Sequence, residues 1–242
     1  MNDVIKQLFE RKSVRVFTEQ EISLEDKNLI LDAAAQAPTA GNQQLYTILD
    51  ITDQSIKDKL VDTCDHQPFI AKSKLVLIFC ADCLKWYDAF RYSGCEPRKP
   101  GVGDLLLAVN DAVIAAQNAV VAAHSLGLGS CYIGDIMENY EEQKALLGLP
   151  EYVFPVAMLV FGYPTQQQLE REKPPRSPRE WIVHENGYHP MDAEQLKALL
   201  EVKSGQPDYE QWLRAFCKRK YNSDFSREMT RSVQKYLEEF QK

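Results

Sequence analysis

The sequence lacks the features that would direct it to a membrane or out of the cell. Its first residues, MNDVIKQLFE, are amphipathic and of mixed charge, without the apolar run of a signal peptide. The apolar stretches around Leu75–Ala81 and Val153–Gly162 are too short to span a bilayer. We find no internal repeat and no low-complexity linker. These absences predict a cytoplasmic protein with no membrane partner.

An excess of basic residues is also absent, because 28 Lys and Arg stand against 35 Asp and Glu, for a formal net charge of -7. A general nucleic-acid binder needs a broad basic surface, so we predict no nucleic-acid partner and expect any anion site to be local. The motifs G-x-S-x-G and H-E-x-x-H and the P-loop do not occur. None of the 4 histidines has ligand spacing to another, and no metal site is predicted.

The 6 cysteines are expected to be reduced, since the chain shows no export signal. Cys80 and Cys83 form a C-x-x-C pair, which we interpret as the end of an apolar strand followed by a chance neighbour. The alternative is a thiol-redox or zinc module. A redox pair usually sits at a helix N-terminus, and zinc would need two further ligands at a recognised spacing.

Hydrophobic patterns predict strands alternating with helices in the middle of the chain and helices at both ends. We expect strands at 45–52, 75–80, 131–134 and 153–162, with Pro155 marking an edge or an irregular start. Helices are predicted at 3–10, 24–36, 54–63, 104–126, 139–147, 192–203, 207–219 and 225–241. Ser23 is the expected N-cap of the second helix. The pattern predicts an α+β fold, an α/β sandwich with a helical C-terminal extension.

The helix predicted at 104–126 is apolar nearly all round, and Gly127 ends it. A helix of that kind belongs in a core or in a subunit interface. The glycines that follow, Gly127 and Gly129, run from helix to strand and lack a third partner. They therefore do not form a dinucleotide loop, and we interpret them as a helix stop and a close approach to a strand.

The segment RKSVRVF (11–17) carries the first candidate site. In an extended segment Arg11, Ser13 and Arg15 share one side, and two guanidiniums with a hydroxyl can bind a phosphate. A solvated basic stretch is the alternative. A second cationic group at Lys173, Arg176 and the nearby Arg179 is stiffened by prolines. Two such groups in an acidic chain indicate one dianionic ligand, unless both only aid solubility.

The turn PTAGNQQ (38–44) offers small residues, backbone N–H groups and three side-chain amides. Amides match the alternating donors and acceptors along the edge of an isoalloxazine ring, although an ordinary polar turn would look the same. A phosphate site and ring-binding amides without an acid–base pair indicate that a cofactor performs the chemistry. No catalytic side chain is therefore predicted.

Four segments together resemble the nitroreductase family. RKSVRVF is similar to its R-x-S-x-R-x-F signature, and APTAGNQQLY is similar to A-P-S-x-x-N-x-Q-P-W. GLGSCYIGDI resembles G-L-G-x-x-x-I-G, and VFGYP followed by KPPR resembles the late G-x-P and K-P-R elements. The match spans roughly residues 5–190 in order. The tail and VHENGYHP look most like the NADPH-dependent, oxygen-insensitive nitroreductases and flavin reductases.

The resemblance implies a mostly antiparallel central sheet flanked by helices, with residues 1–190 as an FMN-binding domain and 191–242 as a helical extension. It also implies FMN as cofactor, NADPH or NADH as electron donor, and a homodimer. The implied 2′-phosphate ligands of NADPH are Arg231 and Arg219. The implied FMN-binding residues are Arg11, Lys12, Ser13, Arg15, Pro38, Thr39, Ala40, Asn42, Gln44, Gln67, Tyr132, Ile133, Gly134, Asp135, Lys173 and Arg176.

The implied activity is ping-pong transfer of two electrons from NAD(P)H through the flavin N5 to nitroaromatics, quinones or free flavin. Three departures from the family pattern stand out. Leu45 and Tyr46 replace Pro-Trp, KPPR contains an extra proline, and Asp135 stands where the subgroup has glycine. Two alternatives share the fold: a flavoprotein with specialised, dehalogenase-like chemistry, and a flavin-based sensing protein without turnover.

Overall fold

The computed structural model describes residues 1–205 and 208–242, and its contacts group them into two compact units. Unit 1 comprises Met1–Arg171 and Glu228–Lys242, and unit 2 comprises Glu172–Arg227. These units are groups of residues in mutual contact. The division into 1–190 and 191–242 concerns folding domains and stays a prediction.

Unit 1 contains a four-stranded sheet with the order β1-β2-β4-β3. The strands are β1 (Tyr46–Asp50), β2 (Leu75–Asp82), β3 (Gly129–Ile133) and β4 (Val153–Gly162). All three neighbouring pairs are antiparallel, which confirms the predicted sheet. Every residue of β2 and β4 is buried, because these central strands are covered on both faces.

The prediction that Pro155 marks an edge is wrong for the strand as a whole, since β4 lies between β2 and β3. The irregular start is confirmed. The register of β2 against β4 shifts between Phe79 and Cys80, so that Phe79 faces Ala157 and Cys80 faces Pro155. β3 pairs with β4 only from Met158 onward. Pro155 therefore sits at a bulge with one free side, where its missing N–H costs no ladder bond.

The predicted helices occur with ends within two residues of those expected, and residue 207, the first of the expected helix 207–219, lies outside the described residues. Ser23 caps α2, since its hydroxyl accepts from the Asp26 N–H at 3.0 Å. The short α4, α5 and α8 were not predicted. The helices of unit 1 are α1 (Asp3–Glu10), α2 (Leu24–Ala35), α3 (Gln54–Thr63), α4 (Phe69–Lys72), α5 (Leu84–Tyr92), α6 (Val102–Ser125), α7 (Tyr140–Leu147), α8 (Gln166–Glu170) and most of α11 (Asp224–Glu239), with the 3-10 turns η1 (Ala40–Asn42) and η2 (Asp135–Met137).

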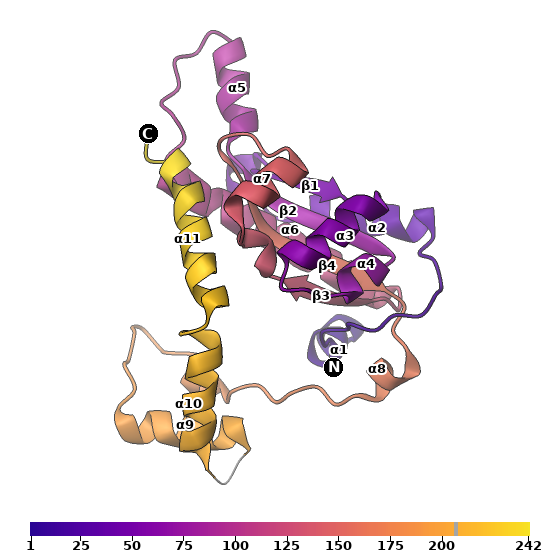
Figure 1. Ribbon diagram of the computed structural model, residues 1–242, viewed down its shortest axis with the longest axis vertical. Coiled ribbons are helices and arrows are strands. Elements are labelled where there is room, and N and C mark those ends of the chain that lie inside the picture. Colours follow the sequence, from indigo (N-terminus) through magenta and orange to yellow (C-terminus); the bar gives the residue numbers. More distant parts are fainter. Residues whose placement is uncertain (206–207) are drawn as a thin grey trace. The chain divides into compact units, whose positions relative to one another are not determined.

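Helix α6 organises unit 1. It contacts all four strands and packs against α2, and Figure 1 shows it behind the sheet with α3 and α4 in front. Its buried face carries many alanines, including Ala108, Ala112, Ala115 and Ala119, which let α6 approach its neighbours closely. By length and composition α6 is apolar enough to cross a membrane. Its buried face instead forms the core of unit 1.

Unit 2 is helical, which confirms the expected C-terminal helices. It contains η3 (Arg179–Trp181), α9 (Ala193–Ser204), α10 (Tyr209–Lys220) and the first residues of α11. Asp192 and Gln195 form a capping box at the start of α9, and α9 contacts α10. Neither helix has a buried residue. The apolar side chains of these two helices are therefore only partly covered in the single chain.

Candidate active site

The N-terminal segment 11–17 docks beside β3 because two glycines make room for it. The Val14 N–H donates to the Ser130 carbonyl at 2.9 Å. A Cβ on Gly129 would lie 2.6 Å from Cγ2 of Val14, and one on Gly162 would lie 2.7 Å from the Phe17 ring. Gly129 thus provides the predicted close approach, and both positions require glycine for this packing.

Three of the predicted phosphate ligands meet around the thiol of Cys131 in β3. Burial raises the pKa of Cys131, while the charges of Arg15 and Arg11 and a hydrogen bond with Ser13 act against that rise. The tertiary structure therefore gathers Arg11, Ser13 and Arg15 at one place, as expected from strand alternation. The two valines that alternate with these residues differ in their surroundings, since Val14 is buried and Val16 is 47% exposed.

Lys12 has a different local role from its neighbours. Its Nζ donates to the Leu169 carbonyl at 2.7 Å and to the Arg171 carbonyl, at the C-terminal end of α8. The Arg171 guanidinium in turn donates to the Ser13 carbonyl. Arg171 was not singled out from the sequence, although it lies two residues before Lys173, the first residue of the KPPR loop. Lys12 and Arg171 together tie the N-terminal segment to α8.

The segment that carries Gln67 reaches the same place. Asp65 and His66 adopt left-handed φ values of 58° and 51°, and the Gln67 side chain donates to the Cys64 carbonyl at 2.9 Å. The Arg15 guanidinium lies 5.9 Å from the centre of the Phe69 ring, at the start of α4. The turn after α3 thus lies next to the cationic group.

The end of β3 completes this arrangement. The Tyr132 hydroxyl donates to the Gln117 side chain of α6 at 3.4 Å, and burial raises the pKa of Tyr132 to about 12 against the effect of Arg11. Burial and the nearby Asp135 raise the pKa of Cys64 to about 12. Ile133 is buried, and a Cβ on Gly134 would meet only Met137 of its own chain, at 3.9 Å. Three segments far apart in sequence therefore share one side of unit 1.

The turn 38–44 is held by a residue that the sequence analysis did not consider. Asp111 of α6 is buried, and its carboxylate accepts from the Ala40 and Leu45 N–H groups at 3.1 Å each. The Thr39 hydroxyl donates to the same carboxylate. An aspartate inside an apolar helix gives no sequence signal of a partner 66 to 72 residues away.

The turn lies at a different level of α6 from the cationic group. Thr39 contacts α6 at Asp111, whereas Arg11 lines a small cavity with Gln117 and His124. At a rise of 1.5 Å per residue these positions are roughly 9–20 Å further along the helix axis. In the single chain, the turn and the N-terminal segment therefore occupy separate parts of unit 1.

Three further cationic candidates, Lys173, Arg176 and Arg219, lie in unit 2. Lys173 and Arg176 belong to the irregular segment before η3. Arg219 belongs to α10, where its guanidinium lies 5.5 Å from the centre of the Phe216 ring. Their participation in a site formed with unit 1 stays a prediction.

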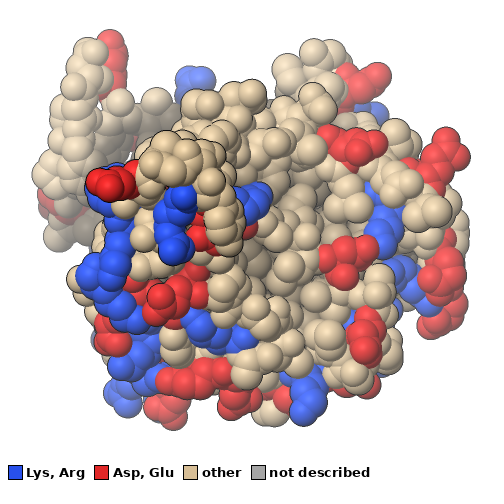
Figure 2. Space-filling model, turned by 90° about the horizontal axis from the view of Figure 1, so that it is seen from above, with Lys and Arg blue, Asp and Glu red and all other residues tan. Residues whose placement is uncertain are grey.

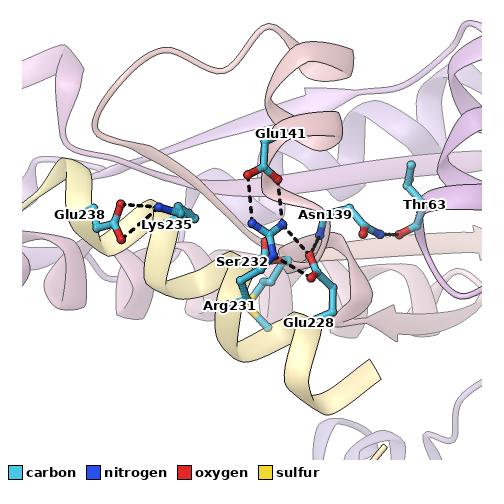
Figure 3. A network of polar contacts seen from close by, with 9 residues as sticks. Thr63, Asn139, Glu141, Glu228, Arg231, Ser232, Lys235 and Glu238 are labelled. Atoms are coloured by element: carbon cyan, nitrogen blue, oxygen red, sulfur yellow. Dashed lines mark hydrogen bonds and ion pairs between the residues drawn. The ribbon is translucent and has the colours of Figure 1, made fainter. Parts of the chain in front are cut away.

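Arg231, the main candidate for the NADPH phosphate, is surrounded by carboxylates. Its Nη atoms donate to both oxygens of Glu141 at 2.9 and 2.8 Å, and its Nε donates to Glu228 at 2.8 Å (Figure 3). Arg231 holds the pKa of Glu141 down, at about 2. Two carboxylates around one guanidinium leave a net negative group, which joins α11 to α7 and would repel a phosphate.

Cys80 and Cys83 do not have the properties of a redox pair. Both are free and buried, and burial raises the pKa of each thiol to about 12, although Cys83 stands at the N-cap of α5. Reactive thiols have lowered pKa values. Across residues 1–205 and 208–242, no group of His, Cys, Asp or Glu side chains is arranged to hold a metal ion.

The comparison with known proteins agrees with this fold. A model of the nitroreductase family matches residues 8–163, so the chain belongs to the nitroreductase family. It is 31% identical over 247 residues to FMN reductase [NAD(P)H] of Bacillus subtilis, covering 98% of this chain and 92% of that protein. It is 34% identical over 197 residues to the oxygen-insensitive NADPH nitroreductase of Salmonella typhimurium, covering 81% and 79% of the two chains. The solved structure of NfrA2 from B. megaterium has a TM-score of 0.83 at 30% identity and covers 99% and 98%. The predicted family is confirmed.

Proposed function

We propose that this protein is an FMN-dependent oxidoreductase that moves two electrons from NADPH or NADH to nitroaromatics, quinones or free flavin. Family membership supports this proposal, as do the relatives from Bacillus subtilis and Salmonella typhimurium, whose names describe FMN and NAD(P)H chemistry. The absence of a recognisable acid–base set in the sequence fits a reaction in which the cofactor supplies the chemistry.

One observation carries the proposal: the convergence of Arg11, Ser13 and Arg15 beside β3. Within the described residues Arg15 forms no ion pair with a carboxylate, although the chain as a whole carries a net charge of -7. Its guanidinium instead acts against the rise that burial causes in the pKa of the Cys131 thiol, and it lies 5.9 Å from the centre of the Phe69 ring. Such a local positive group fits the phosphate of FMN, because charge-assisted hydrogen bonds to phosphate are strong.

The residues around this group have separate tasks in the proposal. Arg11, Ser13 and Arg15 bind the phosphate, and Lys12 holds their segment against α8. Gln67 and the end of β3, from Tyr132 to Asp135, line the ring and the ribityl chain. Bound flavin supplies hydride acceptance and donation. The protein contributes orientation and positive charge, to which Lys173 and Arg176 of unit 2 would add.

We also propose a homodimer. Large apolar side chains of α6 face solvent in the single chain, with Leu106 at 59%, Leu107 at 49% and Val113 at 37% exposure. Helix α1 has no buried residue and exposes Val4, Ile5, Leu8 and Phe9. Contiguous exposed apolar side chains of this kind favour association with another protein surface. In such a dimer, each subunit would cover α6 of the other. The turn 38–44 of one subunit would then reach the flavin site of its partner.

The proposed setting is the cytoplasm, with small-molecule acceptors and no nucleic-acid or membrane partner. On the face shown in Figure 2, Lys and Arg side chains gather mainly along the left side with Asp and Glu side chains among them, and most of the middle carries no charge. Nine residues of the apolar helix α6 are already buried within the single chain, and its exposed apolar side chains, among them Leu106 and Leu107, are assigned to the subunit interface.

An absorbance spectrum of the purified protein, followed by anaerobic addition of NADPH and then NADH, tests the proposal. We expect a flavin spectrum that bleaches and then returns when a quinone or nitroaromatic is added. A flavin that neither nucleotide reduces would indicate a sensing protein. A colourless protein that cannot be reconstituted with FMN would refute the proposal.

A further inference from the structure

The turn 39–45, which is the turn 38–44 without Pro38 and with Leu45, includes three residues with left-handed backbone, and one of them is strained. Gly41 and Asn42 both have a φ of 57°, and Gln44 has a φ of 51°. Glycine adopts the left-handed region freely and asparagine adopts it more readily than most residues, whereas a long side chain such as that of Gln44 is disfavoured there. Strained turns of this kind persist only where the surrounding structure holds them, and they concentrate at functional sites.

The surrounding structure that holds this turn is centred on Asp111. One carboxylate oxygen accepts from the Ala40 N–H and the other from the Leu45 N–H, so a single side chain ties both ends of the turn. The Thr39 hydroxyl donates to Asp111 and accepts from the Gln44 N–H at 2.7 Å. Only a carboxylate offers two acceptor oxygens in this geometry.

A second set of contacts fixes the turn from α5. The Trp86 indole donates to the Gln43 carbonyl at 2.8 Å, and the Lys85 Nζ donates to the Tyr46 carbonyl at 2.6 Å. The backbone of the turn is thus held from two helices. Of the three side-chain amides of the turn, that of Gln44 already has a partner, because it donates to the Ala35 carbonyl at 3.1 Å.

The amides of Asn42 and Gln43 form no hydrogen bond within the described residues, and Asn42 is exposed. The backbone of the turn is thus held by hydrogen bonds, whereas these two amides find no partner among residues 1–205 and 208–242. Val113 and Ile114, which follow Asp111 on α6, are also exposed. The turn therefore lies beside the apolar surface that we assign to the dimer.

We infer that Asp111 is a positioning residue that holds the turn 39–45 in the conformation in which Asn42 and Gln43 complete the flavin site of the second subunit. This inference rests on the proposed function. Asp111 itself would not touch the flavin, because it is buried beneath the turn. Its effect reaches the flavin only through the backbone of residues 39–45.

The test uses the full-length protein, freed of FMN and titrated with FMN while the quenching of flavin fluorescence is followed. Asp111→Asn retains the shape but replaces one acceptor oxygen with an NH₂ donor, which would face a backbone N–H. We expect the variant to remain a dimer by sedimentation and to lose about tenfold or more in FMN affinity, since small misplacements at a site have large effects.

Asn118→Ala is the matched control. Asn118 lies on the same helix, and its side chain donates to the Ala33 carbonyl at 3.1 Å, away from the turn. This variant also removes one hydrogen bond of α6, so it lowers thermal stability without disturbing residues 39–45. We expect its FMN affinity to equal that of the unchanged protein.

Thr39→Val provides a second variant in case Asp111→Asn does not fold or dimerise. It removes only the hydroxyl, and we expect a smaller loss of FMN affinity that is not additive with Asp111→Asn, because both act on one turn. If the stability of Asp111→Asn and Thr39→Val falls while FMN affinity matches that of Asn118→Ala, Asp111 is purely structural and the inference is overturned. An unchanged protein that binds no FMN would instead refute the proposed function.

Discussion

Arg15 and Arg231 were both expected to bind a phosphate, and their surroundings differ in kind. Arg15 lies beside a thiol and a phenylalanine ring, and within the described residues it pairs with no carboxylate. Arg231 donates to Glu141 and Glu228. A guanidinium attracts an anion only while its own charge is not already neutralised. The carboxylates nearby, and not the presence of an arginine, therefore decide which position can serve a ligand.

Replacement of Arg15 should have the largest effect. A charge-assisted hydrogen bond contributes roughly 1.5–3 kcal/mol, so Arg15→Gln should weaken FMN binding by about 10- to 100-fold. Fluorescence titration of the apoprotein measures this change. Arg91→Gln is the control, because Arg91 forms an ion pair with Asp88 within α5 and belongs to no part of the proposed site. Equal FMN affinity in the Arg15 and Arg91 variants would contradict the assignment of Arg15 to the phosphate.

The same contrast between paired and unpaired charge holds for two glutamates three positions apart. Glu138 is 5% exposed, and its Oε1 has no hydrogen-bond partner in the described residues. Burial, followed by the charges of Asp135, Asp65 and Glu228, raises the pKa of Glu138 to about 7. The pKa of Glu141, which Arg231 pairs, is instead held at about 2.

Glu138 should therefore make the protein less stable as the pH rises. Its folded pKa exceeds the unfolded value of 4.5, so its penalty is absent below that value and complete above about pH 7. Glu138→Gln should stabilise the protein by roughly 1–3 kcal/mol at pH 8 and by almost nothing at pH 4. Denaturant unfolding at both pH values measures this. Glu142→Gln, at an exposed position of α7, should parallel the unchanged protein. If the free energy of unfolding of Glu138→Gln changes between pH 4 and pH 8 as that of the unchanged protein does, burial does not destabilise the charged form of Glu138.

Replacement of Arg231 should affect stability and spare nucleotide selectivity. Arg231→Gln should lower the unfolding temperature at pH 7, because Glu141 and Glu228 then face each other without a cation. Arg231 lowers the pKa of Glu141, so this loss should shrink as the pH falls from 4.5 toward 2. The ratio of KM values for NADPH and NADH should change by less than about twofold. A selective rise in the KM for NADPH would restore Arg231 as the 2′-phosphate ligand.

Lys12 should show the smallest effect. Its Nζ is occupied by the carbonyls at the end of α8, so it supports the phosphate site only through the position of the N-terminal segment. Lys12→Met should reduce FMN affinity by roughly two- to fivefold, a size typical of cations at helix C-termini. The titration used for Arg15 serves here as well. A loss as large as that of Arg15→Gln would place Lys12 on the phosphate itself.

The local elements could be predicted because their signals are local. The Ser23 hydroxyl caps α2 by accepting from the N–H of Asp26, three residues later. Gly127 follows the end of α6 with a left-handed φ of 78°. The shared side of Arg11, Ser13 and Arg15 followed from the two-residue period of an extended chain. Helix α5 escaped prediction, since LKWYDAFRY mixes aromatic and charged residues and buries none of them. Pro155 led to the wrong prediction of an edge strand. A central strand accommodates it because the bulge at this position leaves no ladder hydrogen bond for its missing N–H to donate.

The four strands, most of the helices, the family and the cationic segment that begins the site could be predicted from the sequence, because each depends on residues near one another in the chain. Tertiary structure alone decided the rest. It placed Glu141 beside Arg231, 90 residues apart, and Asp111 beneath a turn that precedes it by up to 72 residues. A charge or a strained turn acquires its role from the partners packed around it, and no local pattern records those partners.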